Sequence, residues 1–175
     1  MLRSALVLVG LALCSSPLRP QEWQQWEPAK SRWEPMRTPP FSRYAVRASF
    51  VGRPAPVDLG RDSTVHLYRT MLRQGAKTGP NFADHFTVLM WGCGGTDCAY
   101  LAIVDALTGR VYLAPFFVNA EISYRRTSRL LVVNRMEATF TEEDKPGERL
   151  QDWYSWNGKA LVHVASVPMR PLRQR

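Results

Sequence analysis

The residues most capable of chemistry are Cys93, Cys98 and His85, which lie within one short stretch of the chain. A thiolate activated by a histidine base can attack an acyl carbon, and a carboxylate at Asp84 or Asp97 would orient that base. Glycines beside Cys93 would present backbone N–H groups to a developing oxyanion. The pattern therefore predicts, as one alternative, a hydrolase or transferase that depends on a Cys–His pair.

The same two cysteines favour a competing interpretation, a structural disulfide. The third cysteine, Cys14, belongs to an N-terminal leader, so Cys93 and Cys98 are the only cysteines expected in the mature chain. Two cysteines in an oxidising compartment usually pair. Four residues separate them and two of these are glycines, so the loop can fold back on itself. In the chain-entropy model, closing so short a loop contributes roughly 2 kcal/mol.

Redox and metal chemistry are two further alternatives for this stretch. Redox pairs usually have the spacing Cys-x-x-Cys at the start of a helix, which differs from the spacing here. Zinc would use the cysteines with His85, Asp84 and Asp97, but no His-x-x-x-His or Cys-x-x-Cys spacing occurs. His66 and His163 are expected to be surface or packing residues. We predict no metal and no cofactor, and the chain has no phosphate-binding glycine loop or Gly-x-Ser-x-Gly elbow.

Residues 1–14 have the features of a secretory signal peptide. Arg3 gives a positive start, and residues 5–13 form an apolar run broken only by Gly10. A bilayer-spanning helix needs about 20 apolar residues, so this run is too short to be one. We therefore expect a periplasmic or secreted protein with no transmembrane segment in its mature chain.

The fate of Cys14 separates two forms of the exported protein. Ala12 and Cys14 suit the −3 and −1 positions of a cleavage site, which predicts cleavage before Ser15. The minority alternative is a lipid anchor on Cys14. It requires a small residue directly before the cysteine, and Leu13 occupies that place.

The chain is basic, with 23 Lys and Arg against 15 Asp and Glu and a net charge of +8. Such a balance suits nucleic acid, anionic lipid or an acidic protein, or simply improves solubility. An exported protein seldom meets nucleic acid, so none is expected as a partner. The expected partners are an anionic envelope component or another exported protein.

The remaining chain divides by composition into a leader arm, one domain and a tail. The arm, residues 15–40, is rich in proline and tryptophan, and its Trp23, Trp26 and Trp33 would either bind a partner or pack on the domain's own surface. A single globular domain is expected over residues 41–168, followed by a basic tail over residues 169–175.

A helix is predicted over residues 62–76, capped by Asp62 or Ser63. Its apolar face consists of Val65, Tyr68, Leu72 and Ala76. Its basic stripe consists of Arg61, Arg69, Arg73 and Lys77, of which Arg69 and Arg73 are candidate binding residues. This is the usual pattern of a surface helix, and it also suits contact with an anionic surface.

Strand patterns account for most of the remaining domain. They are predicted at residues 44–50, 86–91, 100–104, 111–113, 130–133 and 138–140. Gly109 can adopt a positive φ in the turn before residue 111. Residues 153–164 predict a hairpin in which Asn157-Gly158 forms a type I′ turn. The expected fold class is α+β, with one N-terminal helix packed on a mainly antiparallel sheet of about five or six strands.

Several spaced motifs of this chain resemble a family of exported bacterial proteins of unknown function. The family pattern is N-F-A-x-H-[YF], then W-G-C-G-x(2,3)-C, then D-A-x-T-G and a later S-x-L-L strand. This chain carries NFADHF at 81–86, WGCGGTDC at 91–98, IVDALTGRV at 103–111 and SRLL at 128–131. It departs at Asp84, where glycine is usual, and at Phe86, where tyrosine is usual. The resemblance implies export and a shared fold, and no catalytic role carries over.

The leading functional hypothesis is a non-enzymatic binding module of the periplasm or envelope. Its basis is the export signal, the single small domain, the expected disulfide and the tryptophan-bearing arm. Two alternatives remain: the Cys–His-dependent hydrolase or transferase, and a purely structural envelope protein.

Overall fold

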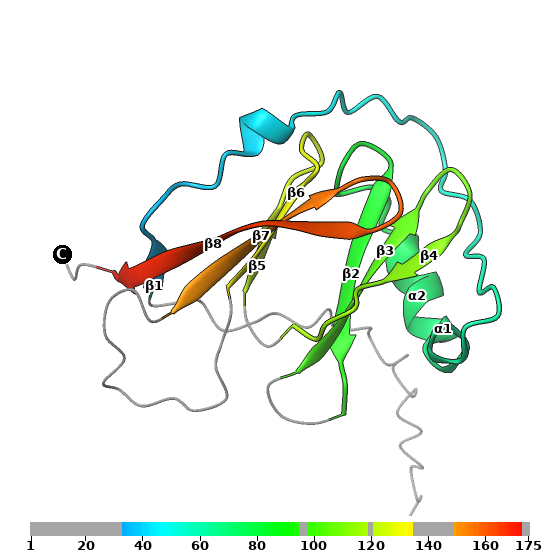
Figure 1. The fold of residues 1–175 in the computed structure, drawn as a ribbon. Helices are drawn as coiled ribbons and strands as arrows, with labels where there is room; N and C mark the ends of the chain where they lie inside the picture. Colours follow the sequence, from blue (N-terminus) through cyan, green and yellow to red (C-terminus); the bar gives the residue numbers. More distant parts are fainter. Residues whose placement is uncertain (1–32, 95–97, 119–120, 135–148, 173–175) are drawn as a thin grey trace, which may run out of the picture.

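The computed structural model describes residues 33–94, 98–118, 121–134 and 149–172 (Figure 1). The elements are, in chain order, β1 (Trp33–Pro35), the 3-10 helix η1 (Phe41–Tyr44), α1 (Ser63–Leu67), α2 (Arg69–Ala76), β2 (Phe86–Gly92), β3 (Ala99–Asp105), β4 (Val111–Leu113), β5 (Ile122–Tyr124), β6 (Leu130–Asn134), β7 (Leu150–Trp156) and β8 (Leu161–Pro171). The strands of the described ranges pair antiparallel, in one five-stranded sheet with the order β1-β8-β7-β6-β5 and one three-stranded sheet with the order β2-β3-β4.

The predicted fold class, α+β with one N-terminal helix on a single sheet, is wrong. The described part of the chain is mostly β and forms two sheets of five and three strands, with helix confined to short segments. The error arises because β1 and β5 are only three residues long, which is too short for a strand period to stand out in the sequence. Their pairing with β8 and β6 decides the sheet order, and that pairing leaves no periodic signal in the sequence.

The predicted helix over residues 62–76 is present as two helices joined at Tyr68. The carboxylate of Asp62 accepts hydrogen bonds from the N–H groups of Thr64 at 2.8 Å and Val65 at 3.1 Å, which caps α1. Tyr68 breaks the helix, with φ −98° and ψ 19°. Its ring contacts those of Trp91 and Tyr100 at centroid distances of 5.2 and 4.9 Å, so this aromatic packing lies at the break.

The predicted strand over residues 44–50 is absent. Tyr44 ends η1, and Ala45 makes only an isolated bridge with Ser128. The predicted strands at residues 86–91, 100–104, 111–113 and 130–133 correspond to β2, β3, β4 and β6. The strand predicted at residues 138–140 lies outside the described residues.

The β7–β8 hairpin is present, but its predicted type I′ turn is wrong. Trp156 pairs with Leu161, so the connection has four residues. Gly158 has a φ of +95°, whereas Asn157 is not among the residues with positive φ, as a type I′ turn would require. The side chain of Asn157 instead accepts hydrogen bonds from the N–H groups of Lys159 and Ala160, both at 2.9 Å.

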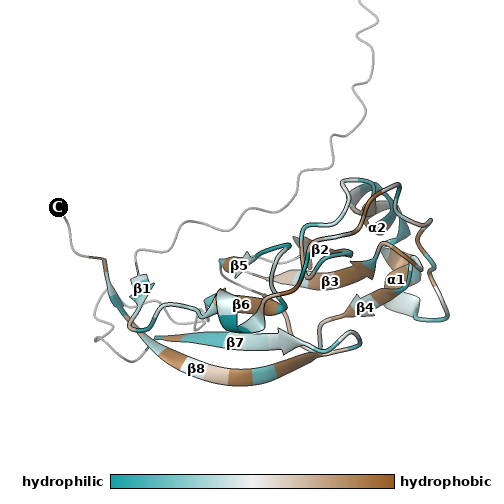
Figure 2. Ribbon diagram, turned by 90° about the horizontal axis from the view of Figure 1, so that it is seen from above, coloured by the Kyte–Doolittle hydropathy of each residue, from teal (hydrophilic) through white to brown (hydrophobic). Residues whose placement is uncertain are grey.

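The two sheets share one hydrophobic core. Phe86, Leu101 and Ile103 of the three-stranded sheet pack in one cluster with Leu131 and Trp156 of the five-stranded sheet. Figure 2 shows hydrophobic colour concentrated along β3, which is buried from Leu101 to Asp105. The core therefore fixes the end of the β2–β3 hairpin that carries His85 relative to the larger sheet.

Strand β1, residues 33–35, belongs to the five-stranded sheet, although it lies within the predicted leader arm. Strand β1 pairs with the end of β8, in the register Trp33↔Pro171. Glu34 and Arg170 form an ion pair across this pairing at 2.9 Å. None of the helices in the described ranges combines the length and the hydrophobicity that a membrane span requires.

Candidate functional site

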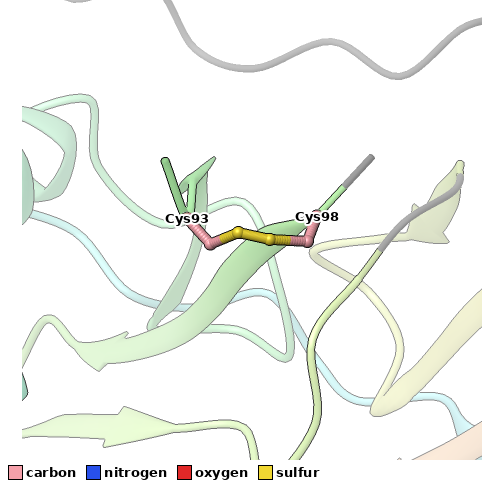
Figure 3. Close-up of a disulfide and its surroundings, with 2 residues drawn as sticks. All are labelled: Cys93 and Cys98. Carbon is pink, nitrogen blue, oxygen red and sulfur yellow. A yellow bond between two sulfur atoms is a disulfide. The ribbon is translucent and has the colours of Figure 1, made fainter. Parts of the chain in front are cut away.

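Cys93 and Cys98 form the predicted disulfide in the loop that joins β2 to β3 (Figure 3). Their Cα atoms lie 5.7 Å apart, within the range that a disulfide spans without backbone movement. The N–H of Cys93 also donates to the carbonyl of Cys98 at 3.2 Å, and Gly94 takes a φ of +94° that turns the loop. The bond links β2 to β3 at the loop end of the hairpin. Because both sulfur atoms are part of it, neither cysteine has a free thiol to act as a nucleophile.

His85 lies at the opposite end of the same hairpin. Phe86, the next residue, pairs with Asp105, whereas Gly92 pairs with Ala99 beside the disulfide. A strand rises about 3.3 Å per residue, so the six steps between these pairs separate them by roughly 20 Å. The structure therefore does not bring His85 to Cys93 or Cys98. Asp97, the other candidate for orienting the base, lies outside the described residues.

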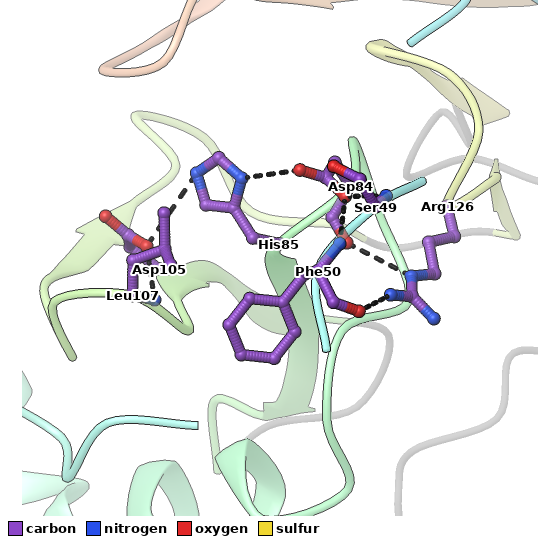
Figure 4. Close-up of polar contacts among 7 residues, drawn as sticks. All are labelled: Ser49, Phe50, Asp84, His85, Asp105, Leu107 and Arg126. Carbon is purple, nitrogen blue, oxygen red and sulfur yellow. Dashed lines mark hydrogen bonds and ion pairs between the residues drawn. The ribbon is translucent and has the colours of Figure 1, made fainter. Parts of the chain in front are cut away.

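The imidazole of His85 lies between two carboxylates (Figure 4). Its Nδ1 is 3.1 Å from Oδ2 of Asp84, and its Nε2 is 3.8 Å from Oδ1 of Asp105. The first distance is a hydrogen bond, while the second is an ion-pair distance when the ring is protonated. The His85 side chain is 25% exposed, so it remains accessible to solvent.

Asp105 owes its position to the turn that follows β3. Its Oδ1 accepts a hydrogen bond from the N–H of Leu107 at 2.8 Å, and its Oδ2 accepts one from the hydroxyl of Thr108 at 2.8 Å. The same residue pairs with Phe86 across the hairpin, which places it next to His85. Asp105 was not among the site residues predicted from the sequence. The signal for it is the Asp-Ala-Leu-Thr-Gly turn motif, which is typical of an aspartate that caps its own turn.

Asp84 is held by an unusual backbone and by Arg126. Ala83 and Asp84 have positive φ values of 41° and 74°, which non-glycine residues rarely adopt. The N–H of Asp84 donates to the carbonyl of Arg126 at 2.8 Å, and Nε of Arg126 donates to the carbonyl of Asp84 at 3.1 Å. The Arg126 guanidinium also donates through Nη2 to the carbonyl of Phe50 at 2.6 Å.

The Asp84 carboxylate joins the segment at residues 49 and 50 to His85. Its Oδ1 accepts hydrogen bonds from the N–H groups of Ser49 and Phe50, and its Oδ2 contacts His85. The Phe50 N–H, the His85 side chain and the Ser49 N–H lower the pKa of Asp84 below 3.8, against a smaller opposing effect of burial. The main role of Asp84 is therefore to hold the segment around residue 50 in place by hydrogen bonds.

We expect Asp84→Ala to lower the free energy of unfolding more than Asp84→Gly. Both changes leave the N–H groups of Ser49 and Phe50 without their acceptor, at a cost of about 1–3 kcal/mol. Glycine adopts the φ of 74° without the Cβ penalty, whereas alanine keeps a penalty of about 1 kcal/mol. Urea denaturation of the two variants measures both terms. Equal stability of the two variants would contradict the role of the backbone.

The lowered pKa of Asp84 leads us to expect that the stability of the folded protein depends on pH. Its pKa in the folded protein is lowered, so its contribution to stability is complete above its ordinary value of 3.8 and is lost as the pH falls through the folded value. The stability difference between the wild type and Asp84→Asn is therefore expected to be constant near neutral pH and to shrink in acid. Denaturation midpoints measured from pH 7 to below pH 3 test this. A difference that grows in acid would contradict it.

His163, Ser166 and Asp152 form a second polar cluster that the sequence analysis did not single out. The Ser166 hydroxyl donates to Oδ1 of the buried Asp152 at 2.6 Å, and Nε2 of His163 lies 3.1 Å from that hydroxyl. In a catalytic triad the carboxylate contacts the other ring nitrogen and the serine proton points to the histidine. Here the Ser166 hydroxyl donates to the carboxylate instead. Its role is therefore to supply a hydrogen bond to the buried charge of Asp152.

The remaining candidate residues are dispersed. Arg69 and Arg73 are exposed on α2, while Trp33 lies in β1 with the Arg149 guanidinium 4.7 Å from its ring centroid. Trp23 and Trp26 lie outside the described residues. No group of three or more His, Cys, Asp or Glu residues in the described ranges is arranged to hold a metal ion.

We expect removal of the disulfide, by Cys93→Ser with Cys98→Ser, to lower the free energy of unfolding by about 2 kcal/mol without unfolding the protein. The closed loop is short and lies away from the shared core, so the core packing should persist. Urea denaturation measures the change, and a reducing agent should reproduce it in the wild type but have no effect on the double variant. Unchanged wild-type stability under reduction would contradict a stabilising bond.

Fold and site together define a two-sheet antiparallel β protein whose β2–β3 hairpin carries a disulfide at one end and an Asp–His–Asp cluster at the other. In comparisons with known proteins, no family model, curated protein or solved structure matches this chain. The resemblance carried by the spaced motifs therefore stays a prediction.

Proposed function

We propose that this protein is a non-enzymatic binding module, exported to the periplasm or envelope, that binds an anionic envelope component. The proposed binding surface is the basic face, defined as Arg69, Arg73 and Lys77 of α2 and its C-cap, with Arg61 before α1.

The basic face is exposed, and its charge is not compensated by ion pairs among the described residues. All four cations are exposed, and none forms an ion pair within the described part of the chain. Arg69, Arg73 and Lys77 follow one another at intervals of four, which places them on one side of a helix. This exposed row of cations is the observation that carries the proposal, since exposed cations attract anionic surfaces.

The opposite side of α2 is fixed to the three-stranded sheet. Leu72 and Ala76 are buried, and Gly75 lies so close to Leu89 that an added Cβ would fall 2.6 Å from its Cδ2. Glycine at this position lets the helix approach β2 closely. The cations are therefore presented by a helix with a fixed orientation.

The disulfide supports the proposed location. Structural disulfides persist in oxidising compartments and are rare in the cytosol. The intact mass of the protein expressed with its own leader tests export. A mass that begins at Ser15 supports a free exported protein, and one that begins at Cys14 with acyl chains supports an anchored one. A mass that retains residues 1–14 without modification would contradict export.

Vesicle co-sedimentation tests the basic face. The protein should bind phosphatidylcholine vesicles that contain phosphatidylglycerol, and it should not bind phosphatidylcholine alone. Each cation near an anionic surface contributes about 1 kcal/mol, so Arg69→Glu, Arg73→Glu and Lys77→Glu together should weaken binding by about 100-fold or more. Added salt should weaken wild-type binding as well.

A matched control changes the same charge elsewhere. Arg43, Arg47 and Arg129 are exposed near η1, so their combined change to glutamate alters the net charge equally. This control should bind the anionic vesicles much better than the α2 variant. Equal loss in the two variants would show that only net charge matters, and absence of binding by the wild type would reject the anionic membrane component.

A further inference from the structure

A pocket of about 220 Å³ lies between the β3–β4 strands and the tip of the β7–β8 hairpin, away from the basic face. Ile103 and Tyr112 contribute from paired positions on β3 and β4. Trp156 and Leu161 contribute from the facing hairpin, where they form its last pair. The pocket is therefore located where the two sheets meet, and it is lined by elements of both.

The size of the pocket suits one ring. An apolar cavity of about 150 Å³ accommodates benzene, so a pocket of this volume has room for a six-membered ring and a short chain. Tyr112 and Trp156 meet edge to face, with ring centroids 5.3 Å apart and planes at 74°. A further ring can pack against such an aromatic pair in offset or edge-to-face geometry.

The polar groups at the pocket favour an anion. Lys159 is the one charged residue of the pocket lining, it is exposed, and no ion pair is described for it within residues 33–94, 98–118, 121–134 and 149–172. Leu113, also in the lining, lies on the edge strand β4. The N–H of Ala114 donates to Leu101 of β3, and the carbonyl of Arg110 accepts from Asp105 of β3. Bonding to one neighbour alternates along an antiparallel strand, so the N–H of Leu113 points away from β3, toward the open edge of the sheet.

We propose that this pocket binds a small aromatic carboxylate, with its ring beside Tyr112 and Trp156 and its carboxylate at Lys159. The apolar and aromatic lining accounts for the ring, and the exposed ammonium of Lys159 accounts for the charge. This site is independent of the basic face, so either can fail without the other.

Titration of the ¹⁵N-labelled protein with phenylacetate tests the proposal. The amide signals of Leu113, Lys159 and Ala160 and the indole signal of Trp156 should shift together and saturate. Benzyl alcohol, which has the ring without the charge, should bind about fivefold more weakly, as expected when one partly exposed ion pair is lost. Equal affinity for the two probes would overturn the role of the carboxylate.

Two variants locate the binding. Lys159→Gln should weaken phenylacetate binding about fivefold and leave benzyl alcohol binding unchanged, since only the charge is removed. Ala160→Trp adds bulk to an exposed residue of the lining and should abolish binding of both probes, with the unfolding midpoint as a check on folding. The variant with Arg69, Arg73 and Lys77 changed to glutamate should bind phenylacetate as the wild type does. Wild-type affinity in both pocket variants, or no saturable shift in the wild type, would overturn the proposal.

Discussion

Gly109→Ala is expected to lower the free energy of unfolding by about 3–5 kcal/mol, one of the two largest effects predicted for this protein. A Cβ added to Gly109 would lie 1.9 Å from the carbonyl oxygen of Pro56 and 2.9 Å from its carbonyl carbon. Both atoms belong to the backbone, so no rotamer change can relieve the contact. The φ of Gly109 is +77°, which adds the cost of a left-handed conformation for alanine.

The clash also removes the contact that fixes the segment before α1. The N–H of Asp58 donates to the carbonyl of Gly109 at 2.8 Å, so the chain near residue 58 is bound directly to the β3–β4 turn. Moving Pro56 away from an alanine would break this bond. Urea denaturation measures the total loss.

Gly158→Ala is the matched control for Gly109→Ala. Gly158 also has a positive φ, of +95°, but an added Cβ would meet nothing within 4 Å. It should therefore cost only about 1 kcal/mol, from the backbone conformation alone. Equal losses for the two alanine variants would mean that the close approach of Pro56 does not constrain the fold.

Trp156→Ala is expected to be comparably damaging, at about 3–5 kcal/mol. The Trp156 side chain is 2% exposed and contacts the rings of Phe86 and Tyr112, each at a centroid distance of 5.3 Å. These partners belong to the three-stranded sheet, whereas Trp156 ends β7. Removing the indole therefore leaves a cavity where the two sheets join.

Trp156→Phe separates packing from hydrogen bonding. The indole N–H of Trp156 is buried and has no hydrogen-bond partner among the described residues, so it already carries a desolvation cost of about 1–3 kcal/mol. Phenylalanine removes that N–H and retains most of the apolar packing, so this variant should be clearly more stable than Trp156→Ala. Denaturation of both variants tests this. Equal losses would contradict the packing contribution, since both variants lack the indole N–H and differ only in the ring.

Local patterns of the sequence predicted the helical region and four of the strands correctly, whereas the strand at residues 44–50 and the type I′ turn were wrong. The helical spacing of Val65, Leu72 and Ala76 identified the buried face of α1 and α2, and all three are buried. Asp62 caps the first helix as the N-cap signal indicated. These signals depend on neighbours within one or two turns of the chain, so a single sequence contains them.

The arrangement of the candidate site could be predicted only in part. Asp84 contacts His85 as the spacing suggested, but Asp105 and Arg126 join the cluster through the β2–β3 pairing and a distant loop. The proximity of His85 and Cys93 in the sequence was misleading, because an intervening strand separates them by its full length. A strand carries residues apart, whereas a helix brings residues four apart together.

The pairing of β1 with β8 has a mechanical consequence. In the register Trp33↔Pro171, Glu34↔Arg170 and Pro35↔Met169, the chain enters the sheet at Trp33 and leaves it at Pro171, at the same end of the strand pair. A force that pulls these two points apart acts across the strand pair, perpendicular to the strands. It would therefore break the hydrogen bonds between β1 and β8 one after another, starting at Trp33. The first structure lost under tension would therefore be β1, which would peel away while the longer β7–β8 pairing still held.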